Sequence, residues 1–69
     1  MNFIVQVQND SAKLFPTADD AIAYAGTRVY LSMTDEIHVR DDLRKGQIAE
    51  WSYGFKAVQI IPRQEDEWF

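Results

Sequence analysis

The chain has 69 residues, no cysteine, and 11 acidic against 7 basic side chains, for a formal net charge of -4. This length is typical of one small domain, and the absence of cysteine excludes a disulfide framework and a thiolate metal site. The acidic balance argues against direct binding to a nucleic-acid backbone, which requires clustered Lys and Arg. We therefore expect a single domain over residues 1–62 and an acidic-aromatic tail over residues 63–69.

The start of the chain alternates apolar and more polar side chains. Phe3, Val5 and Val7 fall on one side of this alternation, which is typical of a half-buried strand. The apolar run is too short for a signal peptide or a membrane span and has no basic residues before it. These features predict a cytoplasmic protein without a membrane partner.

The first helix is predicted after Pro16. Thr17 stands three residues before Asp20, at the spacing of a capping box, and apolar residues then recur at helical intervals over residues 18–25. Gly26 is expected to cap the carboxyl end of this helix. A second interpretation continues the helix through residues 27–31, because the apolar spacing also fits.

Two strands are predicted next, over residues 28–33 and 36–40, because apolar and polar residues alternate in both. Thr34 and Asp35 would then form a compact hairpin connection. The residues expected on the core side are Val29, Leu31, Met33, Ile37 and Val39.

A second helix is expected to begin at Asp41 or Asp42, whose charges suit a helix amino terminus. Gly46 would be a weak interior point of this helix, and Gly54 would end it. Residues 55–61 then read as a last strand with apolar side chains on both faces, which is typical of a central strand. The residues expected on the inner side of the helix are Leu43, Ile48 and Trp51.

The resulting order is strand, helix, strand, strand, helix, strand. This order predicts an α+β domain with a ferredoxin-like βαββαβ arrangement, in which two short helices cover one face of an antiparallel sheet. The longer first helix would instead give a ββαβ sheet with an extended N-terminal helix.

Few residues suit catalysis or metal binding. His38 is the only histidine, and Ser32 could face it across the predicted hairpin, but the pattern favours a solvated histidine on a strand face over a catalytic one. The adjacent carboxylates of residues 19–20 and 41–42 are explained by helix starts. We therefore expect a non-enzymatic protein with no cofactor and no metal.

One basic cluster consists of Arg40, Arg44 and Lys45. These side chains either pair locally with Asp41, Asp42 and Glu50, each pair contributing less than ~1 kcal/mol, or form a contact patch for an acidic surface of a partner protein. Both interpretations remain open at this stage.

The chain ends in three carboxylates and two aromatic residues, Glu65, Asp66, Glu67, Trp68 and Phe69. This ending resembles the acidic C-terminal tip of single-stranded-DNA-binding proteins, which implies capture of a terminal aromatic and its carboxylate by a partner. In the other interpretation, the aromatic residues fold back over the open sheet face and add to the buried area.

Residues 49–55 read Ala-Glu-Trp-Ser-Tyr-Gly-Phe, and Pro62 ends the last apolar run. From residue 28 onward this pattern resembles the small T7-type phage inhibitor of bacterial RNA polymerase. The resemblance implies a helix packed on a small antiparallel sheet and a protein that binds the polymerase. That family grips the polymerase with arginines of its last strand, where this chain has Gln59, Ile60 and Ile61.

Taken together, these features predict an acidic, non-catalytic inhibitor encoded by a phage or mobile element. Its partner would be a host protein that handles nucleic acid, such as RNA polymerase, a CRISPR complex, a nuclease or a repair enzyme. A carboxylate array suits the basic grooves of such proteins, so mimicry of DNA and anti-CRISPR activity belong to this prediction. The alternative is a homodimeric structural or ligand-sensing module that pairs through an open sheet face or edge strand.

Overall fold

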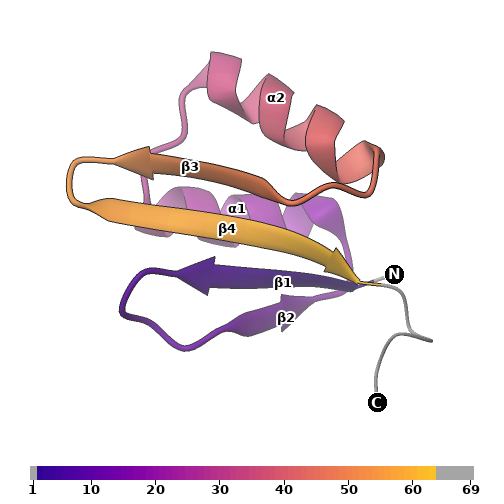
Figure 1. Ribbon diagram of the computed structural model, residues 1–69, viewed down its shortest axis with the longest axis horizontal. Helices are drawn as coiled ribbons and strands as arrows, with labels where there is room; N and C mark the ends of the chain where they lie inside the picture. Colours follow the sequence, from indigo (N-terminus) through magenta and orange to yellow (C-terminus); the bar gives the residue numbers. More distant parts are fainter. Residues whose placement is uncertain (1, 64–69) are drawn as a thin grey trace.

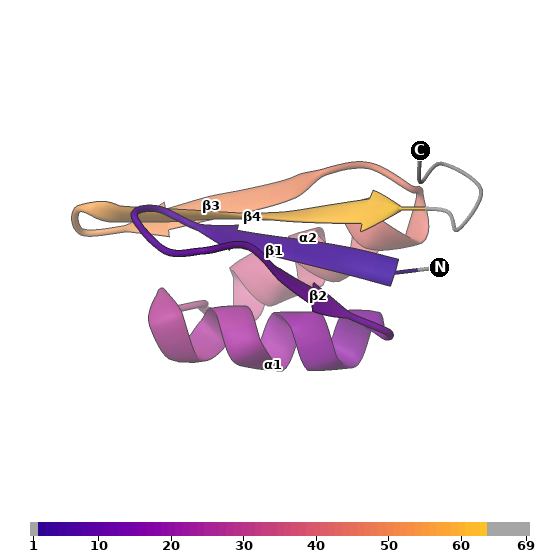
Figure 2. The same ribbon diagram turned by 90° about the horizontal axis from the view of Figure 1, so that it is seen from below.

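The computed structural model describes residues 2–63, which form an α+β fold on one four-stranded antiparallel sheet (Figure 1). The elements are β1 (Asn2–Val7), β2 (Lys13–Phe15), α1 (Ala18–Arg28), α2 (Met33–Arg44), β3 (Ala49–Tyr53) and β4 (Lys56–Arg63). The spatial order of the strands is β2-β1-β4-β3, and both helices lie on the same side of the sheet (Figure 2). The α+β class is confirmed, whereas the order of elements is ββααββ instead of the predicted βαββαβ.

The two longest strands, β1 and β4, form the centre of the sheet. Val5 pairs with Ile60 and Val7 with Val58, and all four side chains are fully buried under the helices. The first and last strands are therefore confirmed, and β4 is central as predicted, since it lies between β1 and β3. Alternation along both strands leaves the opposite face of the sheet without a covering helix among the described residues.

Helix α1 begins at the predicted place. The Thr17 hydroxyl accepts a hydrogen bond of 3.1 Å from the backbone N–H of Asp20, as the capping spacing indicates. The helix runs three residues past the predicted end, so Gly26 lies inside it. It stops before Val29, whose backbone is extended, so the interpretation that continued the helix through residues 27–31 is confirmed for residues 27–28 and wrong for residues 29–31.

Residues 33–44 form one helix, and the predicted strands over residues 28–33 and 36–40 are wrong. Ser32 caps this helix by accepting a 3.1 Å hydrogen bond from the N–H of Asp35. Helix α2 buries a narrow stripe made by Val39 and Leu43. Two other residues of the predicted strand core, Met33 and Ile37, lie instead on its exposed side.

The second predicted helix is also wrong, because its first half belongs to the end of α2 and its second half is β3. Gly46 has a φ of +77° and follows the last turn of α2. The N–H of Gly46 donates to the carbonyl of Leu43, and the N–H of Gln47 donates to that of Asp42. These two bonds form a Schellman motif, in which a left-handed glycine ends the helix.

Strand β3 joins β4 through a two-residue turn at Gly54 and Phe55, with Tyr53 paired to Lys56. Gly54 has a φ of +64°, which matches the first turn position of a type II′ hairpin. Gly54 therefore lies in a hairpin turn, and the prediction that it ends a helix is wrong.

Trp51 links β3 to the end of α1. Its indole N–H donates to the carbonyl oxygen of Val29 across 3.3 Å in the buried core. This bond satisfies a polar group that the core would otherwise leave unpaired. The buried side chains are Phe3, Val5, Val7, Ala21, Ile22, Ala25, Val29, Val39, Leu43, Ala49, Trp51, Val58 and Ile60.

Candidate protein-binding surfaces

Four exposed large apolar residues lie in or next to the α1–α2 connection and the β3–β4 turn. We call the group Tyr30, Met33, Tyr53 and Phe55 the hairpin-end patch. The rings of Tyr30 and Tyr53 lie 5.2 Å apart in a tilted arrangement, so the two connections meet in space. Phe55 lies in the β3–β4 turn, two residues after Tyr53 in the chain.

Exposure in the hairpin-end patch is extreme. The Phe55 side chain is 100% exposed and that of Met33 is 82% exposed. An aromatic side chain carries ~150–250 Å² of surface that gains free energy when it is buried. Phe55 buries none of this surface against the described residues. A two-residue turn also has no requirement for Phe at that position. A partner that buries this ring would gain the full apolar contribution.

The predicted basic cluster lies on α2, but two of its three cations form ion pairs. Arg40 bonds to the carboxylate of Asp19 on α1 and, at 3.0 Å, to that of Glu36 one turn before it. Hydrogen bonds to Asp19 and then to Glu36 raise the pKa of Arg40 above its ordinary value. Arg40 therefore connects the two helices. Its use as a partner contact remains a prediction.

Lys45 bonds to the carboxylate of Asp41 at 2.9 Å, and Arg44 occupies the last turn of α2. The hydrogen bond and charge of Lys45 lower the pKa of Asp41. The carboxylates of Asp41 and Asp42 thus lie near a helix carboxyl end, where the dipole disfavours them, and the prediction that they start a helix is wrong. The neighbouring cations offset this cost.

The predicted tail contacts, Glu65, Asp66, Glu67, Trp68 and Phe69, lie outside the described residues. Arg63 is the last described residue and ends β4. The binding role of these five residues stays a prediction.

Ser32 and His38 do not face each other across a hairpin, since Ser32 caps α2 and His38 lies within that helix. The Ser32 hydroxyl already accepts the N–H of Asp35. Among residues 2–63, no group of three or more histidine or acidic side chains is arranged to hold a metal ion.

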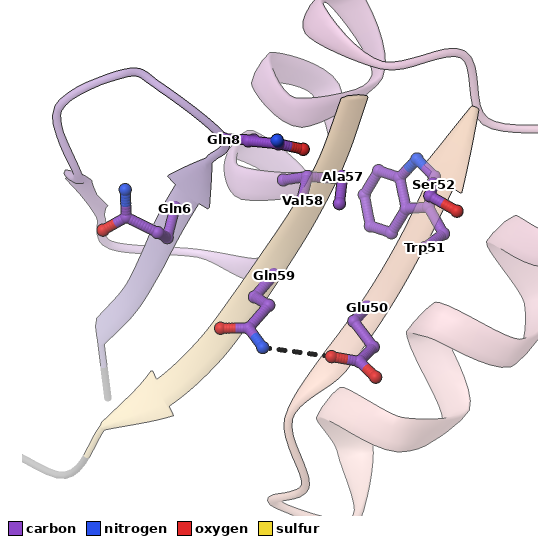
Figure 3. Close-up of a pocket in the computed structure, with 8 residues that line it drawn as sticks. All are labelled: Gln6, Gln8, Glu50, Trp51, Ser52, Ala57, Val58 and Gln59. Atoms are coloured by element: carbon purple, nitrogen blue, oxygen red, sulfur yellow. Dashed lines mark hydrogen bonds between the residues drawn. The ribbon is translucent and has the colours of Figure 1, made fainter. Parts of the chain in front are cut away.

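The open face of the sheet carries a shallow groove of about 430 Å³ near the β3–β4 hairpin (Figure 3). Its outward-facing side chains are Gln6, Gln8, Glu50, Ser52, Ala57 and Gln59. The amide of Gln59 donates to the Glu50 carboxylate across 3.0 Å, which fixes both side chains on the surface. The alternation of β1 indicated the outward position of Gln6, but the contribution of β3 was hidden by its prediction as a helix.

A second part of the open face is apolar. Ile4 on β1 pairs with Leu14 on β2 and with Ile61 on β4, so the three side chains form a row across three strands. Leu14 is 52% exposed, and the other two are partly buried. We call these three residues the isoleucine row.

No protein-family model, curated protein or solved structure matches the chain. Neither helix in residues 2–63 has the length and apolar character needed to cross a membrane.

Proposed function

We propose that this protein is a non-catalytic inhibitor, encoded by a phage or mobile element, that binds a host protein that handles nucleic acid. The observation that carries the proposal is Phe55, a completely exposed aromatic residue in the tight turn that follows Tyr53. Aromatic anchors that enter a pocket dominate the energy of protein interfaces.

Charge supports a partner with a basic surface. The net charge of -4 repels nucleic acid and attracts the grooves that bind it. Asp35 lies in the first turn of α2, two residues after the exposed Met33, whereas the carboxylate of Glu36 is bonded to Arg40. Exposed apolar residues on an acidic protein suit a hydrophobic pocket rimmed by Lys or Arg.

In this proposal the acidic tail makes a second contact with the basic surface of the partner, through Glu65, Asp66 and Glu67. Replacing these three carboxylates by amides should then weaken binding and make it less sensitive to salt, because screening acts on exposed charges. The folded domain should keep its stability in this variant.

The test uses a defined panel of purified targets: bacterial RNA polymerase, a CRISPR surveillance complex, a nuclease and a repair enzyme. Binding of the full chain is measured by biolayer interferometry, and inhibition is measured in the activity assay of each target. Phe55→Ala should weaken binding by at least ~10-fold, since an anchor residue contributes ~2 kcal/mol or more. Its unfolding midpoint should not change.

The matched control is Ile48→Ala, which also shortens an exposed apolar side chain, 54% exposed, but at the α2–β3 connection. It should bind as the wild type does. Failure of the full chain to bind any target would refute the proposed partner class. Equal affinities for Phe55→Ala and the wild type would refute the role of the hairpin-end patch.

A further inference from the structure

We infer that the open sheet face binds a second copy of the same chain, forming a face-to-face dimer related by a two-fold axis along the isoleucine row. This inference goes beyond the proposed function, because it concerns a different surface from the hairpin-end patch. The inference rests on the strand register, which arranges the outward-facing side chains of the open face in rows across the strands.

Strand pairing defines three successive rows across the open face. Ile4 and Ile61 lie in the middle row, together with Leu14. One step toward the end of β4, Asn2 is paired with Arg63. One step the other way, Gln59 is paired with Gln6 on one side and with Glu50 on the other.

Two antiparallel sheets pack face to face about 10 Å apart, with their strands close to parallel in direction. We place the two-fold axis between the two sheets, parallel to the middle row and therefore perpendicular to the strands. Rotation about this axis reverses the strand direction in the second copy. The isoleucine row of one copy then packs on the isoleucine row of the other. The surface is therefore complementary to itself in its apolar part, as a two-fold interface requires.

The same rotation places the Arg63 row of one copy over the Gln59 row of the other. Arg63 then lies over Gln59, and the carboxylate of Glu50 is on the adjacent strand β3, bonded to the Gln59 amide and within reach of the long Arg63 side chain. The symmetry gives this pair twice, and no pair of like charges is brought together in these rows. Charge complementarity between the two ends of one face thus favours a second copy over an unrelated partner.

The size of the face limits the strength of the dimer. The four strands contain 6, 3, 5 and 8 residues, and at ~3.3 Å per residue and ~4.8 Å per strand they give a footprint of roughly 350 Å² per copy. The two copies together bury roughly 700 Å², which is the size of a weak, transient contact. We therefore expect a weak dimer that forms and dissociates with concentration.

The test is a charge exchange, followed by sedimentation equilibrium of the full chain over a concentration series. Arg63→Glu and Glu50→Arg should each weaken the dimer at least ~10-fold, because each places two like-charge contacts in the interface. The double variant R63E/E50R restores opposite charges and should return to within ~3-fold of the wild-type dissociation constant. Circular dichroism verifies the fold of each variant.

Two further variants separate the apolar contribution from the charges. Leu14→Lys, in the isoleucine row, should reduce dimerisation, whereas Ile37→Lys, on the exposed side of α2, should not. A wild-type chain that stays monomeric at all concentrations would overturn the inference. So would single charge variants that associate like the wild type, or a double variant that does not recover.

Nuclear Overhauser contacts from the Ile61 methyl groups identify what covers the row. Filtered contacts between labelled and unlabelled copies would support the dimer. Contacts from Ile61 to residues 64–69 of the same chain would show that the tail covers this face and would overturn the inference of a dimer. The absence of any contact from Ile61 would overturn it as well.

Discussion

The same substitution, Gly to Ala, is expected to have opposite effects at two positions of this fold. Gly26 lies inside α1, and a Cβ built there meets no atom within 4 Å. Alanine restricts the unfolded chain and favours the helix, so Gly26→Ala should stabilise the protein by ~0.5–1 kcal/mol. Gly46 lies at the end of α2 with a φ of +77°.

At Gly46 there is also space for a Cβ, so no clash decides the outcome. The cost comes from the backbone, because an L residue in the left-handed region loses ~1–2 kcal/mol. Gly46→Ala should therefore destabilise the protein by about that amount. For a domain of this length, each ~1 kcal/mol shifts the thermal midpoint by roughly 4–8 °C.

The free energy of unfolding of the wild type and the two variants is measured by urea titration, with tryptophan fluorescence as the signal. Thermal midpoints are a second observable. The outcome discriminates between the observed fold and the predicted one. If residues 41–53 formed a helix with Gly46 inside it, Gly46→Ala would raise stability. A stabilised Gly46→Ala variant would thus refute the Schellman assignment and the position of β3.

Three further predictions concern the contacts that hold α2 and β3. Ser32→Ala removes the cap of α2 and should cost ~1 kcal/mol in a urea titration, and Ser32→Asp should restore most of it. Trp51→Phe leaves the Val29 carbonyl without its indole donor and should cost ~1–3 kcal/mol; an unchanged midpoint would mean that the 3.3 Å bond contributes nothing. Because Lys45 lowers the pKa of Asp41, carbon-detected NMR should find this carboxyl titrating below an ordinary Asp, and Lys45→Met should move it back up. The stabilising effect of this pair is present above the unfolded-state pKa of Asp41 and is lost as the pH falls through the lowered folded value.

The parts of the fold that the sequence predicted are those in which local and tertiary signals agree. The alternation in β1 and the capping spacing of Thr17 and Asp20 both correspond to the structure. The same capping spacing recurs at Ser32 and Asp35, and it marks the real start of α2. It was overridden by an apparent alternation through residues 36–40, which is too short to distinguish a strand from a helix with a narrow buried stripe.

The wrong prediction for residues 28–40 also caused the wrong prediction for the residues that follow them. With residues 28–40 predicted as two strands, Asp41 and Asp42 are the nearest possible caps, and the prediction therefore places the following residues in a helix. Gly46 carried the contrary signal, since glycine a few residues after a helical run is more often a helix end than an interior residue. The hairpin at Gly54 was missed because Trp51 also fits a helical spacing.

The hairpin-end patch was not predictable for the same reason. The strand interpretation assigned Met33 to the core, whereas α2 places it on the exposed side. Tyr30 and Tyr53 come from segments that were predicted as a strand and a helix, and only the real topology brings their rings together. The site thus depends on tertiary contacts that a local pattern does not encode.

The two proposed surfaces have a combined consequence. The hairpin-end patch is at the turn end of the sheet, and the two-fold axis lies across its strands, so a dimer would carry its two Phe55 rings at opposite ends. Such a dimer could bind two sites of one target at once, and its apparent affinity would exceed that of the monomer without any new contact.

Arg63→Glu should then lower the apparent affinity for a target presented at high density on a sensor surface. At low density, where each chain reaches only one site, the same variant should bind as the wild type does. Phe55→Ala should weaken binding at both densities, so the two surfaces are separable in a single experiment.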